Sequence, residues 1–116
     1  MRIERELMRG AGPLAVLKAL ERQEMYGYEL AQVLEKRTNG VLAMGQSTLY
    51  PMLYNLEAKG LVHGSWREAT EAEGGRARKY YALTAKGRAR LAKDQKQWVA
   101  VSGALAGLGI RADLVS

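Results

Sequence analysis

The segment from Gln46 to Gly60 carries the clearest helical pattern of the chain. Its apolar residues are spaced i, i+3, i+4 and i+7, which gives a helix one stripe facing a core; they are Leu49, Met52, Leu53 and Leu56. The opposite face holds hydroxyl, amide and aromatic groups and no acid: Ser47, Pro51, Tyr54 and Ala58, flanked by Tyr50 and Asn55. We expect Ser47 to cap this helix, Pro51 to lie in its first turn and Gly60 to end it. Such a face can contact phosphates and base edges, and an ordinary surface helix would show the same pattern.

Two further helical stretches precede this segment. Pro13 suits the first position of a helix, and an apolar stripe then runs to about Gln23: Leu14, Val16, Leu17 and Leu20. The alternative is a helix that begins earlier, in the charged residues 1–9, and passes through residues 10–13; that early part could pack on a neighbouring chain. The next stripe begins near Gly27 and stops at Asn39-Gly40: Tyr28, Leu30, Ala31, Val33 and Leu34. With a tight link or one brief strand at residues 41–45, the order is that of a helix-turn-helix unit.

After the third helix the period changes to that of a strand. Residues 61–67 and 78–83 are rich in Val, Trp and Tyr, and the polar loop 68–77 joins them, which predicts a β-hairpin with a long tip. We assign Tyr81 and Leu83 to the core face of the second strand, and Arg78 and Tyr80 to the other face. Trp66 is expected to pack as an ordinary hydrophobic residue. Three helices followed by a hairpin predict an α+β, mostly helical fold, the winged helix-turn-helix.

A long last helix is expected to run from an N-cap at Thr84 toward Leu108. Its apolar positions repeat every seven residues, with a second line three residues on; they are Leu91, Trp98, Leu105, Val101 and Leu108. A seam this narrow suits packing on another helix, and we expect the same helix of a second subunit to cover it. The alternative is that the helix folds back on its own domain. The chain is therefore divided into a winged-helix domain, residues 1–83, and a dimerisation helix with a frayed tail, residues 84–116.

Composition points to a polyanionic partner. The 116 residues include 18 Lys and Arg against 12 Asp and Glu, for a net charge of +6 and a pI near 9.8. This balance favours nucleic acid first and an anionic membrane surface second. No apolar run reaches the roughly 18 residues needed to span a bilayer, and the N-terminus is too charged for a signal peptide. A cytoplasmic protein at the nucleoid is expected.

Residues for catalysis or metal binding are scarce. The chain has no cysteine and a single histidine, His63, which we interpret as an ordinary strand residue. The pair Gly74-Gly75 lacks both phosphate-loop patterns. We therefore expect no enzymatic activity, no metal site and no cofactor.

Taken together and in this order, four stretches resemble the PadR family of transcriptional regulators, in its short form with a single C-terminal helix. They are Tyr26–Leu30 (YGYEL), Ser47–Pro51 (STLYP), Leu56–Leu61 (LEAKGL) and Gly74–Thr84 (GGRARKYYALT), followed by Gly87. The likeness covers roughly residues 4 to 108. It implies a homodimeric repressor whose third helix enters the major groove, whose hairpin reaches the adjacent backbone or minor groove, and whose last helix forms the dimer.

By position, the resemblance implies which residues contact DNA. The groove-facing set is Ser47, Thr48, Tyr50 and Tyr54, beside which Asn55 offers an amide, and the hairpin set is Arg76, Arg78 and Lys79. Hydroxyls and phenols hydrogen-bond phosphates and base edges, and arginine has a planar fork suited to phosphate. One feature departs from this scheme, because the hairpin loop also contains three acids: Glu68, Glu71 and Glu73.

Trp98 has two interpretations. Some family members hold flat aromatic compounds between paired tryptophans of the last helix, so the resemblance implies an effector site at Trp98, where an indole can stack on a planar ligand. Tryptophan is also common as an interface anchor. For the whole chain, the leading hypothesis is a homodimeric repressor of an inverted-repeat operator in double-stranded DNA, and its effector version adds release by a flat aromatic compound. The alternative is a winged-helix protein-interaction module that does not bind DNA.

Overall fold

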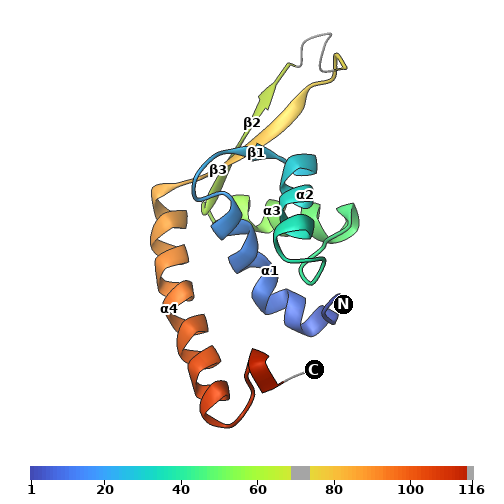
Figure 1. The fold of residues 1–116 in the computed structure, drawn as a ribbon. Coiled ribbons are helices and arrows are strands. Elements are labelled where there is room, and N and C mark those ends of the chain that lie inside the picture. Colours follow the sequence, from blue (N-terminus) through green and yellow to red (C-terminus); the bar gives the residue numbers. More distant parts are fainter. Residues whose placement is uncertain (69–73, 115–116) are drawn as a thin grey trace.

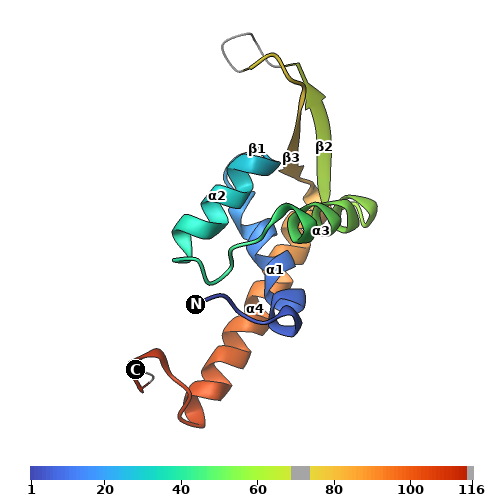
Figure 2. The ribbon, with the colours of Figure 1, turned by 90° about the vertical axis from the view of Figure 1, so that its right-hand side faces the viewer.

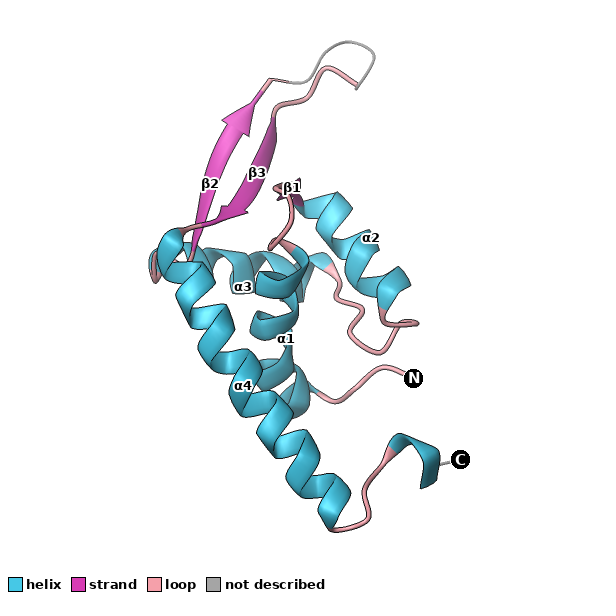
Figure 3. Cartoon of the chain, turned by 60° about the vertical axis from the view of Figure 1, so that its left-hand side comes forward, coloured by secondary structure: helices cyan, strands magenta, loops and turns pink. Residues whose placement is uncertain are grey.

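The computed structural model describes residues 1–68 and 74–114. Its elements follow in the order α1 (Arg5–Ala19), β1 (Met25–Tyr26), α2 (Gly27–Arg37), α3 (Gln46–Ala58), β2 (Val62–Arg67), β3 (Arg78–Leu83), α4 (Ala85–Gly107) and a 3₁₀ turn (Ala112–Leu114). Helices α1 to α3 pack together, the β2–β3 hairpin projects from them as a wing, and α4 runs alongside α1 and past it (Figures 1 and 3). This is the predicted winged helix-turn-helix, α+β and mostly helical.

The wing is anchored by a small antiparallel sheet. In the described part of the chain its strand order is β1-β3-β2, and Val62 pairs with Leu83 while Arg67 pairs with Arg78 at the far end. The hairpin was predicted, but β1 was not, because a strand of two residues has no alternation to detect. Residues 41–45 form the predicted tight link and not the alternative brief strand, and two turns over residues 38–43 lead into it.

Helix α1 follows the alternative prediction and not the preferred one. It begins at Arg5, passes through Pro13 and ends at Ala19, short of Gln23. Pro13 is tolerated inside the helix because its missing N–H leaves only the carbonyl of Arg9, an exposed residue, without a helical partner. The early part packs on this chain's own core, where Met8 is buried.

Helix α3 begins two residues earlier than predicted. Its N-cap is Gly45, not Ser47, and no side chain caps it, so Pro51 lies in the second turn. The end is as predicted: Gly60 has a φ of 75°, its N–H donates to the carbonyl of Glu57, and the next N–H, of Leu61, donates to that of Leu56. This double hydrogen bond is the glycine-dependent way of closing a helix. The hydroxyl of Ser47 is consequently left on the exposed first turn.

One apolar core joins all the helices. Its most buried members come from α1, the turn after it, α2 and α3: Val16, Leu17, Leu20, Leu30, Leu49 and Leu53. Tyr81 of β3 is buried with them, and Leu83 packs against the cluster, as predicted. Leu91 of α4 also belongs to it, with 2% of its surface exposed. The assignment of Leu91 to a seam for another subunit therefore needs correction, since its own domain already covers it.

Helix α4 starts as predicted. The Thr84 hydroxyl accepts from the N–H of Gly87 at 2.9 Å and donates to the carbonyl of Gly60 at 2.6 Å. This cap ties the start of α4 to the end of α3. Because Thr84 directly follows β3, the same hydrogen bonds also fix the base of the wing relative to α3.

Candidate nucleic-acid interface

The outer face of α3 is open to solvent. All five residues predicted to face a groove are exposed: Ser47, Thr48, Tyr50, Tyr54 and Asn55. Tyr54 is the most prominent, with 72% of its surface accessible. The buried stripe of Leu49, Leu53 and Leu56 holds the helix against the core so that this face points outward (Figure 2). The face therefore offers hydroxyl, phenol and amide groups on a rigid support.

Three arginines that the sequence analysis did not single out lie beside the first turn of α3. Arg2, Arg5 and Arg9 line a groove of about 580 Å³ together with Ser47 and Thr48. Within the described residues none of the three has a hydrogen bond or an ion pair. Arg5 and Arg9 are four residues apart and so share one face of α1, which was the signal available in the sequence, while Arg2 precedes the helix. They add positive charge on one flank of the exposed face.

On the other flank, Lys79 ties the wing to α3. Its ammonium donates to the Glu57 carboxylate at 2.9 Å, and a second oxygen of that carboxylate accepts from the N–H of Gly64 at 3.2 Å. The hydrogen bond from Lys79 lowers the pKa of Glu57, and the same bond raises the pKa of Lys79. Lys79 is therefore already paired with an acid, and its main role in this structure is to hold the hairpin against α3.

Arg78 stands in a stack of aromatic rings and guanidinium groups at the base of the wing. Its guanidinium lies 4.4 Å from the ring centre of Tyr26, which lies 5.5 Å from that of Tyr80. Arg67 covers Tyr80 at 4.4 Å and pairs with Glu24. Cation–π contacts of this kind contribute about 0.5–1 kcal/mol each at exposed sites. The stack fastens β3 to β1 and orients the wing.

Arg76 is the exposed cation of the described wing tip. It has no hydrogen bond or ion pair among the described residues. Glu68, at the end of β2, is exposed as well. Glu71 and Glu73, the other acids of the loop, lie outside the described residues. Of the three predicted wing contacts, Arg76 is thus the one whose charge is not paired with or stacked on another described residue.

Trp66 does not pack into the core, contrary to the prediction. It is 69% exposed and sits opposite Lys79 on the hairpin. It lines a cleft of about 570 Å³ between the wing and α2, together with Tyr28, Tyr50 and Arg76. The physical reason is its position at the outer end of β2, beyond the reach of the helices. The sequence pattern shows which residues share a strand face but not how far the hairpin extends past the core.

The C-terminal half of α4 has an exposed apolar surface. Val101, Leu105 and Leu108 are 51%, 40% and 81% exposed, in contrast to the buried Leu91 at the other end of the seam. The first half of this helix therefore packs on its own domain, as in the alternative interpretation, and its second half projects beyond that domain (Figure 3).

Trp98 lies where these two halves meet. It is 39% exposed, and one edge of its ring contacts α1, where a Cβ added at Gly10 would lie 3.5 Å from the indole Cζ2. The rest of the indole is accessible. Because Gly10 has no side chain, the ring can approach α1 closely.

Other chemistry finds little support. Among the described residues there is no group of three or more His, Cys, Asp or Glu side chains that could hold a metal ion. His63 is an exposed residue of β2. No helix within the described ranges is long and apolar enough to cross a membrane.

A helix-turn-helix with a hairpin wing and an acid-free outer face on α3 defines the class of winged-helix regulators. A family model described as the transcriptional regulator PadR-like family matches residues 16–93. The chain belongs to this family of transcriptional regulators, as the sequence analysis indicated.

Individual proteins that the chain resembles in sequence or in structure are also transcriptional regulators. The chain is 37% identical over 92 residues to transcriptional regulator Rv3488 of Mycobacterium tuberculosis, covering 79% of each protein. A PadR-family transcriptional regulator from Eggerthella lenta has a similar structure, with a TM-score of 0.74 and 33% identity over 89% of this chain and 85% of that one. A Streptococcus transcriptional regulator matches with a TM-score of 0.76 and 30% identity, covering 92% of this chain and 100% of that one.

Proposed function

We propose that the chain is a homodimeric repressor that binds an inverted repeat in double-stranded DNA. The observation that carries the proposal is the exposed, acid-free face of α3, flanked by the arginines of residues 2–9 on one side and by Arg76 on the other. In this proposal Ser47, Thr48, Tyr50, Tyr54 and Asn55 enter the major groove. The flanking arginines contact the phosphate backbone, which determines where the helix sits on the duplex.

The proposed dimer is formed by the second half of α4. Trp98, Val101, Leu105 and Leu108 expose apolar surface there. Contiguous apolar surface of this kind marks sites of protein association. A twofold axis at this surface would direct two copies of α3 toward half-sites about one helical turn, or 10 bp, apart.

The experiment that tests the proposal combines a mass measurement with a gel shift. Light scattering should give the mass of a dimer, and the chain should retard DNA taken from upstream of its own gene. If each dimer contacts roughly six to ten phosphates, its affinity should fall by about 10³ to 10⁵ between 50 and 200 mM salt. A stable monomer that retards no DNA at low salt would refute the repressor and favour the protein-interaction module.

We further propose that flat aromatic compounds bind at Trp98 and release the repressor. The accessible part of the indole supports this, since an offset ring pair is worth about 0.5–1.5 kcal/mol beyond its buried area. In a Trp66→Phe background, in which Trp98 alone fluoresces, a ligand of this class should quench the emission. The quench should disappear in Trp98→Ala while the dimer largely persists. Unchanged emission across a broad panel of such compounds would leave Trp98 as a packing residue.

A further inference from the structure

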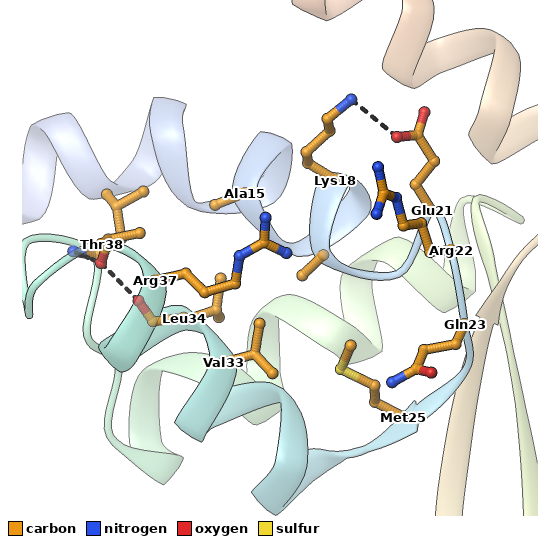
Figure 4. A pocket seen from close by; sticks show the side chains of 12 residues that line it. Ala15, Lys18, Glu21, Arg22, Gln23, Met25, Val33, Leu34, Arg37 and Thr38 are labelled. Atoms are coloured by element: carbon orange, nitrogen blue, oxygen red, sulfur yellow. Dashed lines mark hydrogen bonds and ion pairs between the residues drawn. The ribbon is translucent and has the colours of Figure 1, made fainter.

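A further groove lies between α1 and α2, and no residue of α3 lines it (Figure 4). Its volume is about 480 Å³, within the range of pockets that hold small molecules. The apolar part of its lining consists of Ala15, Ala19, Met25, Val33, Leu34 and Leu42. None of the lining residues is aromatic. The wall is thus made of small and aliphatic side chains, which suit a saturated chain and offer no ring for stacking.

The rim of this groove carries an excess of positive charge. Lys18 is neutralised, because its ammonium pairs with the Glu21 carboxylate at 2.8 Å, and this hydrogen bond lowers the pKa of Glu21. Arg22 and Arg37 have no hydrogen bond or ion pair among the described residues. In Figure 4 the side chain of Arg37 extends from α2 toward α1, and that of Arg22 turns toward α1 as well. Two guanidinium groups therefore remain available beside an apolar floor.

Two other polar side chains line the groove, the Gln23 amide and the Thr38 hydroxyl, and the hydroxyl is already occupied. The Thr38 hydroxyl donates to the carbonyl of Leu34 at 2.5 Å and accepts from the N–H of Leu42 at 3.0 Å. It closes the loop after α2 and has no further donor to offer. Recognition in this groove must consequently come from the two arginines, the Gln23 amide and the apolar floor.

We propose that this groove binds a medium-chain aliphatic carboxylate. The carboxylate would pair with the forked guanidinium groups of Arg22 and Arg37, which match it in geometry and in charge. The hydrocarbon chain would lie on the floor formed by Ala15, Ala19 and Val33. The site is separate from Trp98 and does not depend on the proposed binding of DNA or of aromatic effectors.

Titration calorimetry of the full chain with octanoate tests this inference. A single saturable site is expected, with a dissociation constant on the order of 100 μM for a ligand of this size. Arg22→Gln and Arg37→Gln should each weaken binding by about tenfold, because each removes one charged hydrogen-bonding partner of the carboxylate. Amide NMR spectra should show shifts at Ala15, Ala19 and Val33 when octanoate is added.

Three controls locate the ligand. Lys36→Gln removes a neighbouring charge of α2 that does not line the groove, and it should leave the affinity unchanged. Octan-1-ol, which has the chain but no carboxylate, should bind at least about tenfold more weakly than octanoate. Trp98→Ala should have no effect. The inference is overturned if octanoate does not saturate, if the double variant Arg22→Gln/Arg37→Gln binds as well as the parent, or if Trp98→Ala abolishes binding.

Discussion

Replacing Gly87 with alanine should destabilise the chain by about 3 kcal/mol or more, at the upper end of the cost of overpacking. A Cβ at this position would overlap the backbone carbonyl of Leu61, which cannot swing aside as a flexible side chain would. The N–H of Gly87 is also the donor to the Thr84 cap, so a shift of α4 away from Leu61 would break that hydrogen bond. Thermal unfolding followed by circular dichroism should show a melting temperature lower by more than about 10 °C.

Gly103→Ala is the matched control on the same helix. Nothing lies within 4 Å of a Cβ added there, and alanine is favoured over glycine in a helix interior by up to about 1 kcal/mol. Gly103 also lies on the side of α4 opposite Val101 and Leu105, at 200° from each on a helical projection. Its melting temperature should therefore stay the same or rise. If Gly87→Ala melted like Gly103→Ala, the close contact of α4 with Leu61 would be wrong.

Replacing Arg5 and Arg9 together with alanine should weaken binding to the operator by about 100-fold and flatten its salt dependence. Both side chains are exposed beside the first turn of α3 and have no partner among the described residues. Each lost phosphate contact should lower the salt slope by about 0.9, and a dimer loses every contact twice. Fluorescence anisotropy over a range of salt concentrations measures both quantities.

The control for charge is the double variant Lys93→Ala/Lys96→Ala, which removes the same two charges from exposed positions of α4. It should change the affinity by less than about threefold, since surface charges beyond about 10 Å from phosphate are screened at 0.1 M salt. Arg76→Ala should also weaken binding to the operator. It removes one contact in place of two, so the loss of binding free energy should be about half that of the arginine pair. Equal loss in the lysine and arginine variants would indicate a general charge effect, and the arginines would not be specific contacts.

Most elements of the winged helix could be predicted because they follow from local patterns. The stripe from Leu49 to Leu56 requires a helix with one buried face, and the glycines at positions 40 and 60 stop helices with positive φ. The hairpin followed from two stretches rich in Val, Trp and Tyr, bounded by glycine and joined by a polar loop. The errors occurred where two local signals compete: Pro13 and Ser47 both mark helix starts in sequence, yet both lie inside helices whose ends are set by contacts with the core.

The candidate interface was predicted as a set of residues but not as a set of roles. Lys79 and Arg78 appear equivalent to Arg76 in sequence, since all three are cations of the hairpin. In the fold, Lys79 is paired with Glu57 from another element, and Arg78 stacks on Tyr26 from β1. Those partners are 22 and 52 residues away, and no local pattern connects them. The same holds for Arg5 and Arg9, whose proximity to Ser47 arises only when α1 packs on α3.

Sequence patterns that span a few residues were sufficient to predict the family, the helix-turn-helix and the hairpin. Hydrophobic period, capping residues and glycines all act within such short distances along the chain. Packing decided three other matters: Leu91 belongs to the core, Trp66 is exposed to solvent, and Arg76 has no ion pair within residues 1–68 and 74–114, whereas Lys79 is paired with Glu57. Each of these depends on distances between residues far apart in the sequence. Such distances are determined only when the helices close around a common core.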